Sequence, residues 1–348
     1  MVTITRIVLM PIPGYLLYGG SSELFAALLM IIVLGLTDWL DGIMARREGP
    51  SVLGGLLDPI ADKIFIAVIY LPLTDQGAIP IVFTAFIFAR DFIVTALRTS
   101  LSLRDAPMRT SKLAKYKTAI QMVGIGYVIL YLSYENAPNA PMVWLFIVGP
   151  ITFPVGLILY RLIKGQKQGQ RSFTMMTLMI FAVGMKQFLG LHLAIMASLV
   201  IITAMTVISG FSYIVDAWSA FRGERHLREI FHFILDGILV PVLFVLLLGA
   251  YDSRLMSVAV ILVVTLELAV GGLGNLLASE KKTRTFGASS ARSIAQTLLA
   301  AAALVLARLA GDTFLIAGQI CIGSALAITV LYCAISFWRH RRSYLSAI

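Results

Sequence analysis

The sequence predicts an all-α polytopic membrane protein, and composition, apolar segmentation and the placement of basic residues each support this. Of the 348 residues, 59% are hydrophobic and only 13% are charged, with a mean hydropathy of +0.90. A soluble domain of this size carries about a quarter charged residues, so the composition excludes an ordinary soluble enzyme or binding domain. It indicates helices that cross a lipid bilayer instead.

About twelve apolar stretches are long enough to be transmembrane helices, which need roughly 20 residues each. They lie near residues 5–20, 23–47, 56–74, 79–103, 113–133, 142–163, 171–190, 193–220, 231–250, 256–278, 289–309 and 313–338. An even number of crossings returns the chain to the side on which it began. The N- and C-termini are therefore predicted to share one side of the membrane.

The basic residues indicate which side that is. With the N-terminus inside, 23 of the 28 lysine and arginine residues fall in inner loops or at inner helix ends. Cytoplasmic loops carry such an excess, so both termini are predicted to be cytoplasmic. The net charge of +10 is thus spread over loops on one membrane face, next to an anionic lipid leaflet, and this excludes nucleic acid as its partner.

Four carboxylates lie beside apolar segments between Thr37 and Lys63. In a membrane protein such charges cost free energy, so they mark a functional site by default. Residues three or four apart share one face of a helix, so each pair would present its side chains together. Two facing pairs would form an oxygen cage that suits two hard divalent cations around a phosphoryl centre. The four residues are Asp38, Asp41, Asp58 and Asp62.

Small residues and one arginine accompany the acids. Gly42 and Ala45 keep one face of the first helix low, so that a phosphorylated ligand can approach the backbone. Arg46 lies one turn beyond and can bind a phosphate through two parallel hydrogen bonds. Gly54 lets the second helix start close to the first. The stretch is therefore predicted to bind a phosphorylated ligand next to the cage.

Together these positions form Asp-x2-Asp-Gly-x2-Ala-Arg-x7-Gly-x3-Asp-x3-Asp, which resembles the signature of the CDP-alcohol phosphatidyltransferases at all eight positions. Members of that family transfer a phosphatidyl group from a CDP-linked lipid to an alcohol and release CMP. The resemblance implies that the four acids bind two divalent cations, Mg²⁺ or Mn²⁺, and that Asp62 is also the general base. It further implies that the CDP lipid is held by Gly42, Ala45, Arg46 and Gly54.

The acceptor side resembles the phosphatidylglycerophosphate synthases. Those enzymes carry Gly-Lys-x-Lys-Thr-x2-Gln, and this chain has Lys115-Tyr116-Lys117-Thr118-x2-Gln121 with Ala114 in place of the glycine. With Arg98, these lysines favour a phosphorylated alcohol, most simply glycerol 3-phosphate. Inositol phosphate and phosphatidylglycerol stay open as acceptors. Arg6, in Thr3-x2-Arg6, is either a further phosphate ligand or a positive anchor at the inner face.

Two regions follow from these patterns. The stretch Ile208 to Tyr213 resembles the last helix of those synthases, which predicts a catalytic domain at 1–222 with a helical hairpin inserted within 142–190. Residues 223–348 form a four-helix membrane region. A shift of 233 residues puts Ala45 on Ala278 and Gly54 on Gly287, and it puts the four acids on glycine or alanine. This region is therefore expected to be a degenerate, metal-free repeat that supports the fold, a homodimer contact or a partner.

The rival interpretation is a twelve-helix transporter built from two related halves. Such a protein would carry polar or broken helices in both halves, whereas the acids here cluster at one end of one half. The transferase interpretation places the protein in the inner (cytoplasmic) membrane, with its active site facing the cytoplasm. Its expected partners are membrane lipids, CDP-diacylglycerol and a small phosphorylated alcohol.

Overall fold

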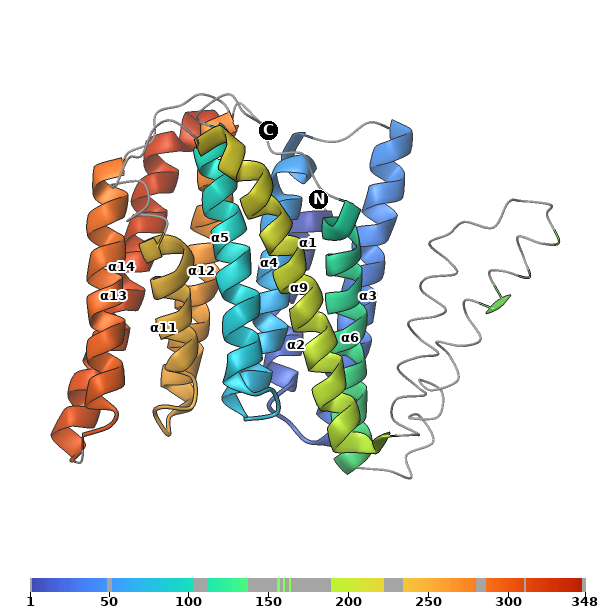
Figure 1. The fold of residues 1–348 in the computed structure, drawn as a ribbon, viewed down its shortest axis with the longest axis horizontal. Coiled ribbons are helices and arrows are strands. Elements are labelled where there is room, and N and C mark those ends of the chain that lie inside the picture. The colour runs from blue at the N-terminus through green and yellow to red at the C-terminus, as the bar shows by residue number, and fades with distance from the viewer. Residues whose placement is uncertain are drawn as a thin grey trace.

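The structure, a computed structural model, describes residues 2–48, 52–102, 112–136, 189–221, 234–279, 286–309 and 311–345, and a few single positions between 155 and 163. Over this part of the chain all regular secondary structure is helical, which confirms the all-α prediction. The helices run side by side, and both ends of the chain lie at the same end of the bundle (Figure 1). Which side of the membrane that end faces stays a prediction.

The N-terminal region begins with a helix that is interrupted before a proline. α1 (Val2–Leu9) and α2 (Pro11–Leu16) are separated at Met10. Proline has no N–H to donate and is readily accepted in the first turn of a helix, so Pro11 starts a new helix there. A turn then leads into the long helices, which are α3 (Ser21–Glu48), α4 (Val52–Asp75), α5 (Ile81–Ser102), α6 (Lys112–Asn136) and α9 (Leu191–Phe221).

The C-terminal region also starts with an interrupted helix. A π-helical turn, η1 (Leu235–Leu239), is followed by α11 (Val240–Leu246), with Pro241 in its first turn. Prolines and π-helical turns are the usual causes of such breaks. Three long helices complete the chain, namely α12 (Arg254–Ser279), α13 (Phe286–Leu306) and α14 (Asp312–Leu345).

Ten of the twelve predicted segments correspond to described helices, with ends that differ by a few residues. The predicted segment 5–20 contains α1 and α2, and 231–250 contains η1 and α11. The segments were therefore predicted, but the division at Met10 and the π-helical turn at Leu235–Leu239 were not. The inserted hairpin, at 142–163 and 171–190, lies almost entirely outside the described residues.

Three stretches of the described helices are long and apolar enough to cross a membrane by length and composition. They are Leu191–Val215 of α9, Arg254–Gly272 of α12 and Asp312–Arg339 of α14. Shorter apolar stretches occur in α3, α6, α13 and the η1–α11 pair. These apolar helices indicate an integral membrane protein.

The two regions form one continuous bundle. α12 packs against α4 and α5, and α5 also contacts η1 and α11. At the end opposite the termini, the Asp75 carboxylate accepts hydrogen bonds from the Tyr18 hydroxyl (2.9 Å), the Ser257 hydroxyl (2.7 Å) and the Gly249 N–H (3.2 Å). Hydrogen bonds to a charged group are stronger than neutral ones, so Asp75 fastens the C-terminal region to α4.

Candidate active site

The signature positions lie on α3 and α4, in the halves of these helices next to the connection at 49–51. The two helices run antiparallel, so both acid pairs lie towards the end of the bundle that carries the N-terminus (Figure 1). α1 packs against both helices. Of the eight signature side chains the structure describes that of Asp62. Seven lie outside the described side chains, and these are Asp38, Asp41, Gly42, Ala45, Arg46, Gly54 and Asp58.

Asp62 forms an ion pair with Arg6, which reaches it from α1. The distance from Arg6 Nη2 to Asp62 Oδ1 is 3.2 Å, and the Arg6 side chain is only 4% exposed whereas that of Asp62 is 43% exposed. The buried guanidinium thus anchors a carboxylate that still faces open space. The structure places Arg6 beside the candidate general base, and its assignment to the acceptor phosphate stays a prediction.

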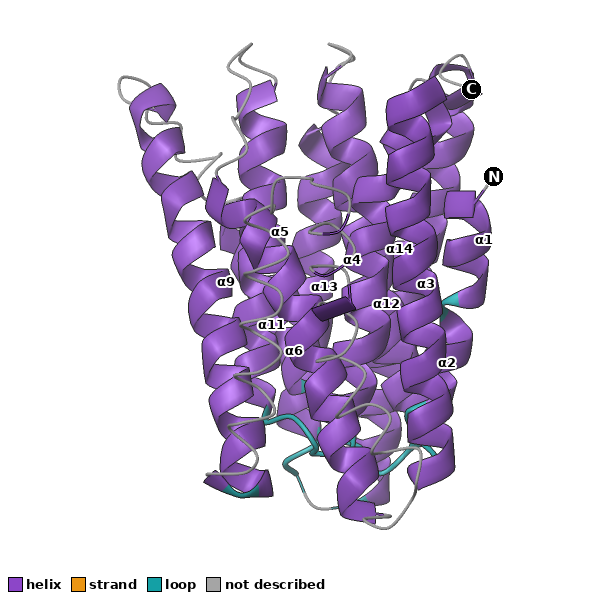
Figure 2. Cartoon of the chain, turned by 90° about the vertical axis from the view of Figure 1, so that its right-hand side faces the viewer, coloured by secondary structure: helices purple, strands orange, loops and turns teal. Residues whose placement is uncertain are grey.

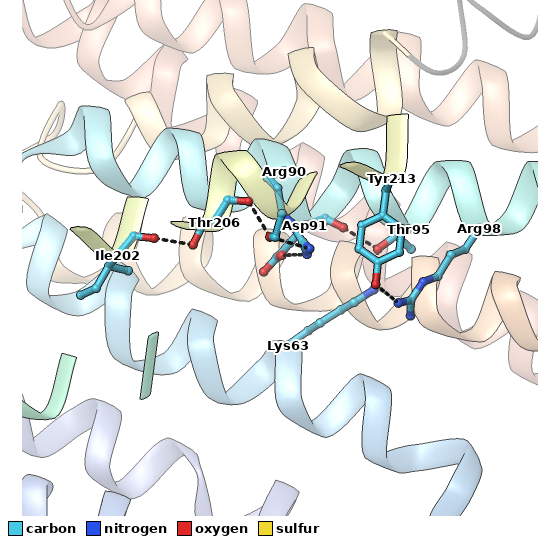
Figure 3. Close-up of polar contacts among 9 residues, drawn as sticks. Lys63, Arg90, Asp91, Thr95, Arg98, Ile202, Thr206 and Tyr213 are labelled. Carbon is cyan, nitrogen blue, oxygen red and sulfur yellow. Dashed lines mark hydrogen bonds and ion pairs between the residues drawn. The ribbon is translucent and has the colours of Figure 1, made fainter. Parts of the chain in front are cut away.

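Lys63 connects the acid-bearing helix to α5. Its ammonium group donates a hydrogen bond to the Thr95 hydroxyl, and that hydroxyl donates to the backbone carbonyl of Asp91 one turn earlier (Figure 3). Thr95 is buried, so this contact lies inside the bundle. The position of α4 immediately after Asp62 is therefore coupled to that of α5.

Arg90 and Asp91 form a second ion pair on α5. Arg90 Nη1 lies 2.8 Å from Asp91 Oδ1, and both side chains are almost buried. The second terminal nitrogen of Arg90, Nη2, donates to the Ser209 hydroxyl on α9 at 3.1 Å. A Cβ at Gly210 would lie 2.6 Å from Arg90 Cγ, so the glycine makes room for this arginine. Charges at this depth in a membrane protein are usually paired, and Arg90 and Asp91 follow that rule.

Tyr213 on α9 lies between two arginines. Its ring is fully buried, and the guanidinium carbons of Arg90 and Arg98 each lie 5.6 Å from the ring centre. Arg98 also donates a hydrogen bond of 3.5 Å to the Tyr213 hydroxyl (Figure 3). Cations are attracted to the face of an aromatic ring, so Tyr213 holds Arg98 in place.

Sequence reasoning missed this role of Tyr213. The signal available was its spacing from Ser209, because residues four apart share one face of a helix. The remaining acceptor candidates, Lys115 and Lys117, lie on the first turns of α6, which packs against α3 and α9. Their side chains lie outside the described ones.

An apolar cavity of about 210 Å³ lies between α3, α4 and α6. Gly35 of α3, Phe65 of α4 and Gly126 of α6 contribute to its lining. Gly35 precedes Asp38 by three residues, and Phe65 follows Asp62 by three. The cavity therefore begins about one helical turn from the acids, on the side towards the middle of the bundle.

No group of three or more histidine, cysteine, aspartate or glutamate side chains gathers among the described ones. Of the four signature acids, only the side chain of Asp62 is among the described ones, so that statement does not concern the set of four. Their residue type and helix positions still suit divalent cations, since carboxylate oxygens are the preferred ligands of Mg²⁺. The half-exposed carboxylate of Asp62 fits this arrangement.

Comparison with known proteins points to the same family as the signature on α3 and α4. The sequence model of the CDP-alcohol phosphatidyltransferase family matches residues 1–158. The CDP-diacylglycerol–glycerol-3-phosphate 3-phosphatidyltransferase of Rickettsia typhi is 32% identical over 152 residues, which cover 43% of this chain and 82% of that protein. The enzyme of the same name from Shigella flexneri is 30% identical over 168 residues, which cover 46% of this chain and 86% of that protein.

A relative named for another product is also similar. Human cardiolipin synthase (CMP-forming) is 40% identical over 118 residues, which cover 33% of this chain and 38% of that protein. No solved structure matches the chain. The intact signature on α3 and α4, the family match and the extent of the bacterial similarities lead to one conclusion: this chain is an enzyme of the CDP-alcohol phosphatidyltransferase family.

Proposed function

We propose that this enzyme transfers a phosphatidyl group from CDP-diacylglycerol to glycerol 3-phosphate, giving phosphatidylglycerophosphate and CMP. The observation that carries the proposal is the complete signature on two adjacent helices, with Asp62 held by a buried arginine. The names of the bacterial relatives support the same donor and acceptor.

The acid set would hold two divalent cations, Mg²⁺ or Mn²⁺, through Asp38, Asp41, Asp58 and Asp62. Bound there, the cations would supply positive charge against the phosphoryl oxygens and the departing CMP. Asp62 would also accept the proton of the attacking hydroxyl. Its 43% exposure leaves it accessible to a substrate, and Arg6 fixes its direction.

The two substrates would approach from different sides of Asp62. Gly42, Ala45, Arg46 and Gly54 would hold the nucleotide along the α3–α4 connection. Arg98, positioned by Tyr213, would bind the acceptor phosphate together with Lys115 and Lys117. A hydroxyl attached to that phosphate could then reach the phosphoryl centre between them.

The apolar cavity between α3, α4 and α6 suits one acyl chain of the lipid donor. Its lining is almost wholly apolar, and it begins about one turn from the acids, where a lipid glycerol backbone would lie. Because lipid tails are as apolar as this lining, the cavity would hold the acyl chain by shape and packing, with no hydrophobic transfer from water. The active site would then face the cytoplasm of the inner membrane, with the acyl chains in the bilayer.

The test is CMP release by the purified protein in detergent, with CDP-diacylglycerol, Mg²⁺ or Mn²⁺, and glycerol 3-phosphate. We expect metal-dependent release that Asp62→Asn abolishes. Asp252→Asn is a matched control, because this exposed acid lies in the turn before α12 at the far end of the bundle. Absence of release with every alcohol tested would overturn the proposal.

A second acceptor is favoured by one observation, the 40% identity to human cardiolipin synthase over 118 residues. Phosphatidylglycerol would then replace glycerol 3-phosphate, with the same donor and the same acids. Inositol phosphate is the third acceptor to test. Release with phosphatidylglycerol or inositol phosphate alone would keep the chemistry and reassign the acceptor.

A further inference from the structure

The C-terminal region contacts α4 within the signature itself. Gly272 of α12 lies against Ile60, which stands between Asp58 and Asp62 on α4. A Cβ at Gly272 would lie 2.5 Å from Ile60 Cγ1 and 3.3 Å from its Cδ1. Carbon atoms in contact prefer about 3.5–4.0 Å, so a methyl group there would require the Ile60 side chain or the two helices to shift by about 1 Å.

The neighbouring glycine makes the equivalent contact with α5. A Cβ at Gly271 would lie 2.9 Å from Thr95 Cγ2. Thr95 is the residue that accepts the hydrogen bond from Lys63, directly after Asp62. The two glycines of α12 therefore pack against both helices that position the candidate base.

The C-terminal region follows the same structural plan as α1–α5. In each region a first helix is interrupted before a proline and is followed by three long helices. α2 packs against α3 and α4, and α11 packs against α12 and α13 in the same way. The turns between the last two helices both contain a glycine with positive φ, Gly77 (73°) and Gly311 (127°).

The polar contacts between the last two helices also correspond. Lys63 of α4 donates to Thr95 of α5, and Gln296 of α13 donates to Thr329 of α14 at 2.7 Å. The two donors are 233 residues apart and the two acceptors 234 apart. The repeat suggested by Ala278 and Gly287 is thus supported by helix order, packing and a side-chain contact.

This alignment places one of the two contacting glycines, Gly271, at the position of a lost acid. A shift of 233 residues puts Asp38 on Gly271 and Asp41 on Gly274. The face of α3 that carries acids in the first region is therefore a glycine face on α12. Gly271 packs against Thr95 of α5, whereas a Cβ at Gly274 would meet no described atom within 4 Å. Gly272, which contacts Ile60, falls on Trp39 in this alignment.

A buried polar cluster holds α12 rigidly against α13 and α14. Glu267 of α12 forms an ion pair of 3.1 Å with Arg292 of α13 and accepts a hydrogen bond of 2.6 Å from Gln296. The guanidinium of Arg292 lies 4.2 Å from the centre of the Tyr332 ring on α14. A helix fixed in this way can transmit its position to α4 and α5.

We infer that residues 234–345 are a non-catalytic repeat of the α1–α5 unit, and that its α12 positions α4 for phosphatidyl transfer through Gly271 and Gly272. Both glycines act as positioning residues, because they touch α4 and α5 and no reacting group. The inference rests on the proposed function for its catalytic part. The contact itself can be tested without activity.

The test compares four variants of the full chain, one of them the Ile60→Ala single variant, by CMP release per folded protein and by thermal unfolding. Gly272→Ala should lower kcat by about 10- to 100-fold, the cost of a displacement of about 1 Å at a reacting centre. Gly274→Ala is the matched control on the same helix, because its Cβ would meet no described atom within 4 Å. It should keep wild-type kcat and Tm.

The third variant, Gly272→Ala with Ile60→Ala, removes the atoms that the new methyl group would strike. It should recover kcat to within about threefold of the Ile60→Ala single variant, and it should recover Tm with it. A Gly272→Ala enzyme with unchanged kcat and Tm would overturn the inference, as would a loss of kcat that Ile60→Ala does not relieve. An inactive wild type would overturn the proposed function instead, while the Tm comparison would still test the contact.

Discussion

The two regions of the molecule share the same order of helices but differ in how exposed their ion pairs are. In the first region, the ion pair between Arg6 and Asp62 is half open, with 43% of the acid exposed. In the second, the ion pair between Arg292 and Glu267 is closed, with exposures of 8% and 5%. A carboxylate kept accessible can serve a substrate, whereas a carboxylate enclosed by protein partners serves packing. The comparison separates a site from a scaffold within one fold.

The largest expected effect comes from breaking the half-open ion pair between Arg6 and Asp62. Asp62→Asn keeps the shape of the side chain but removes the proton acceptor and one anionic ligand. We expect CMP release to fall by about 10²–10⁴-fold, and Tm to fall less than in the closed pair, because the amide oxygen can still accept a hydrogen bond from Arg6. Steady-state kinetics and a thermal scan on the same preparation check this. Activity within about tenfold of the wild type would exclude Asp62 as the base.

The closed pair should show the opposite pattern. Glu267→Ala leaves the Arg292 guanidinium buried without its carboxylate, and breaking a buried pair in this way costs about 3–5 kcal/mol. We expect a clear loss of stability in detergent unfolding. The kcat of the protein that stays folded should fall much less than in Asp62→Asn, because Glu267 reaches the site only through the position of α12. A selective loss of kcat at unchanged stability would contradict the scaffold assignment.

The cavity offers a test of donor binding. Gly35→Leu would add a side chain where a Cβ meets no described atom within 4 Å, and so would fill the cavity beside the acids. We expect the KM for long-chain CDP-diacylglycerol to rise several-fold, while the KM for glycerol 3-phosphate stays unchanged. A short-chain donor provides the control. Equal effects on both donors would place the acyl chain elsewhere.

The smallest expected effect concerns Tyr213, which positions the candidate acceptor ligand Arg98. Tyr213→Phe keeps the ring between the two arginines and removes a hydrogen bond that is already long at 3.5 Å. We expect the KM for glycerol 3-phosphate to rise about threefold, and more in Tyr213→Leu, which also loses the cation–π attraction. The donor KM should not move. A change in donor KM alone would assign Arg98 to the nucleotide.

The sequence was informative wherever function imposes residue types at fixed spacing. That the four acids lie on two successive helices could be predicted, because charges beside apolar membrane segments cost free energy and so mark a functional site. The helix breaks at Met10 and Leu239 were missed, although Pro11 and Pro241 were visible signals for them.

Contacts between regions could not be predicted in the same way. The contact between Gly272 and Ile60 depends on how α12 packs against α4. A glycine has no side chain, so its residue type does not indicate which residue lies next to it. Tyr213 was also inconspicuous, since an aromatic residue in an apolar helix is ordinary core until its two arginine neighbours are known. Local patterns therefore predicted the family and the candidate site, whereas the contacts of Gly272 and Tyr213 became visible only in the folded chain.

The packing of α12 on α4 and α5 has a consequence for stoichiometry. A support supplied by the same polypeptide is present once for every active site, and dilution cannot remove it. Specific activity should therefore stay constant as the purified enzyme is diluted in detergent. The covered face is also closed to other molecules, so any self-association must use a surface that α12 leaves exposed.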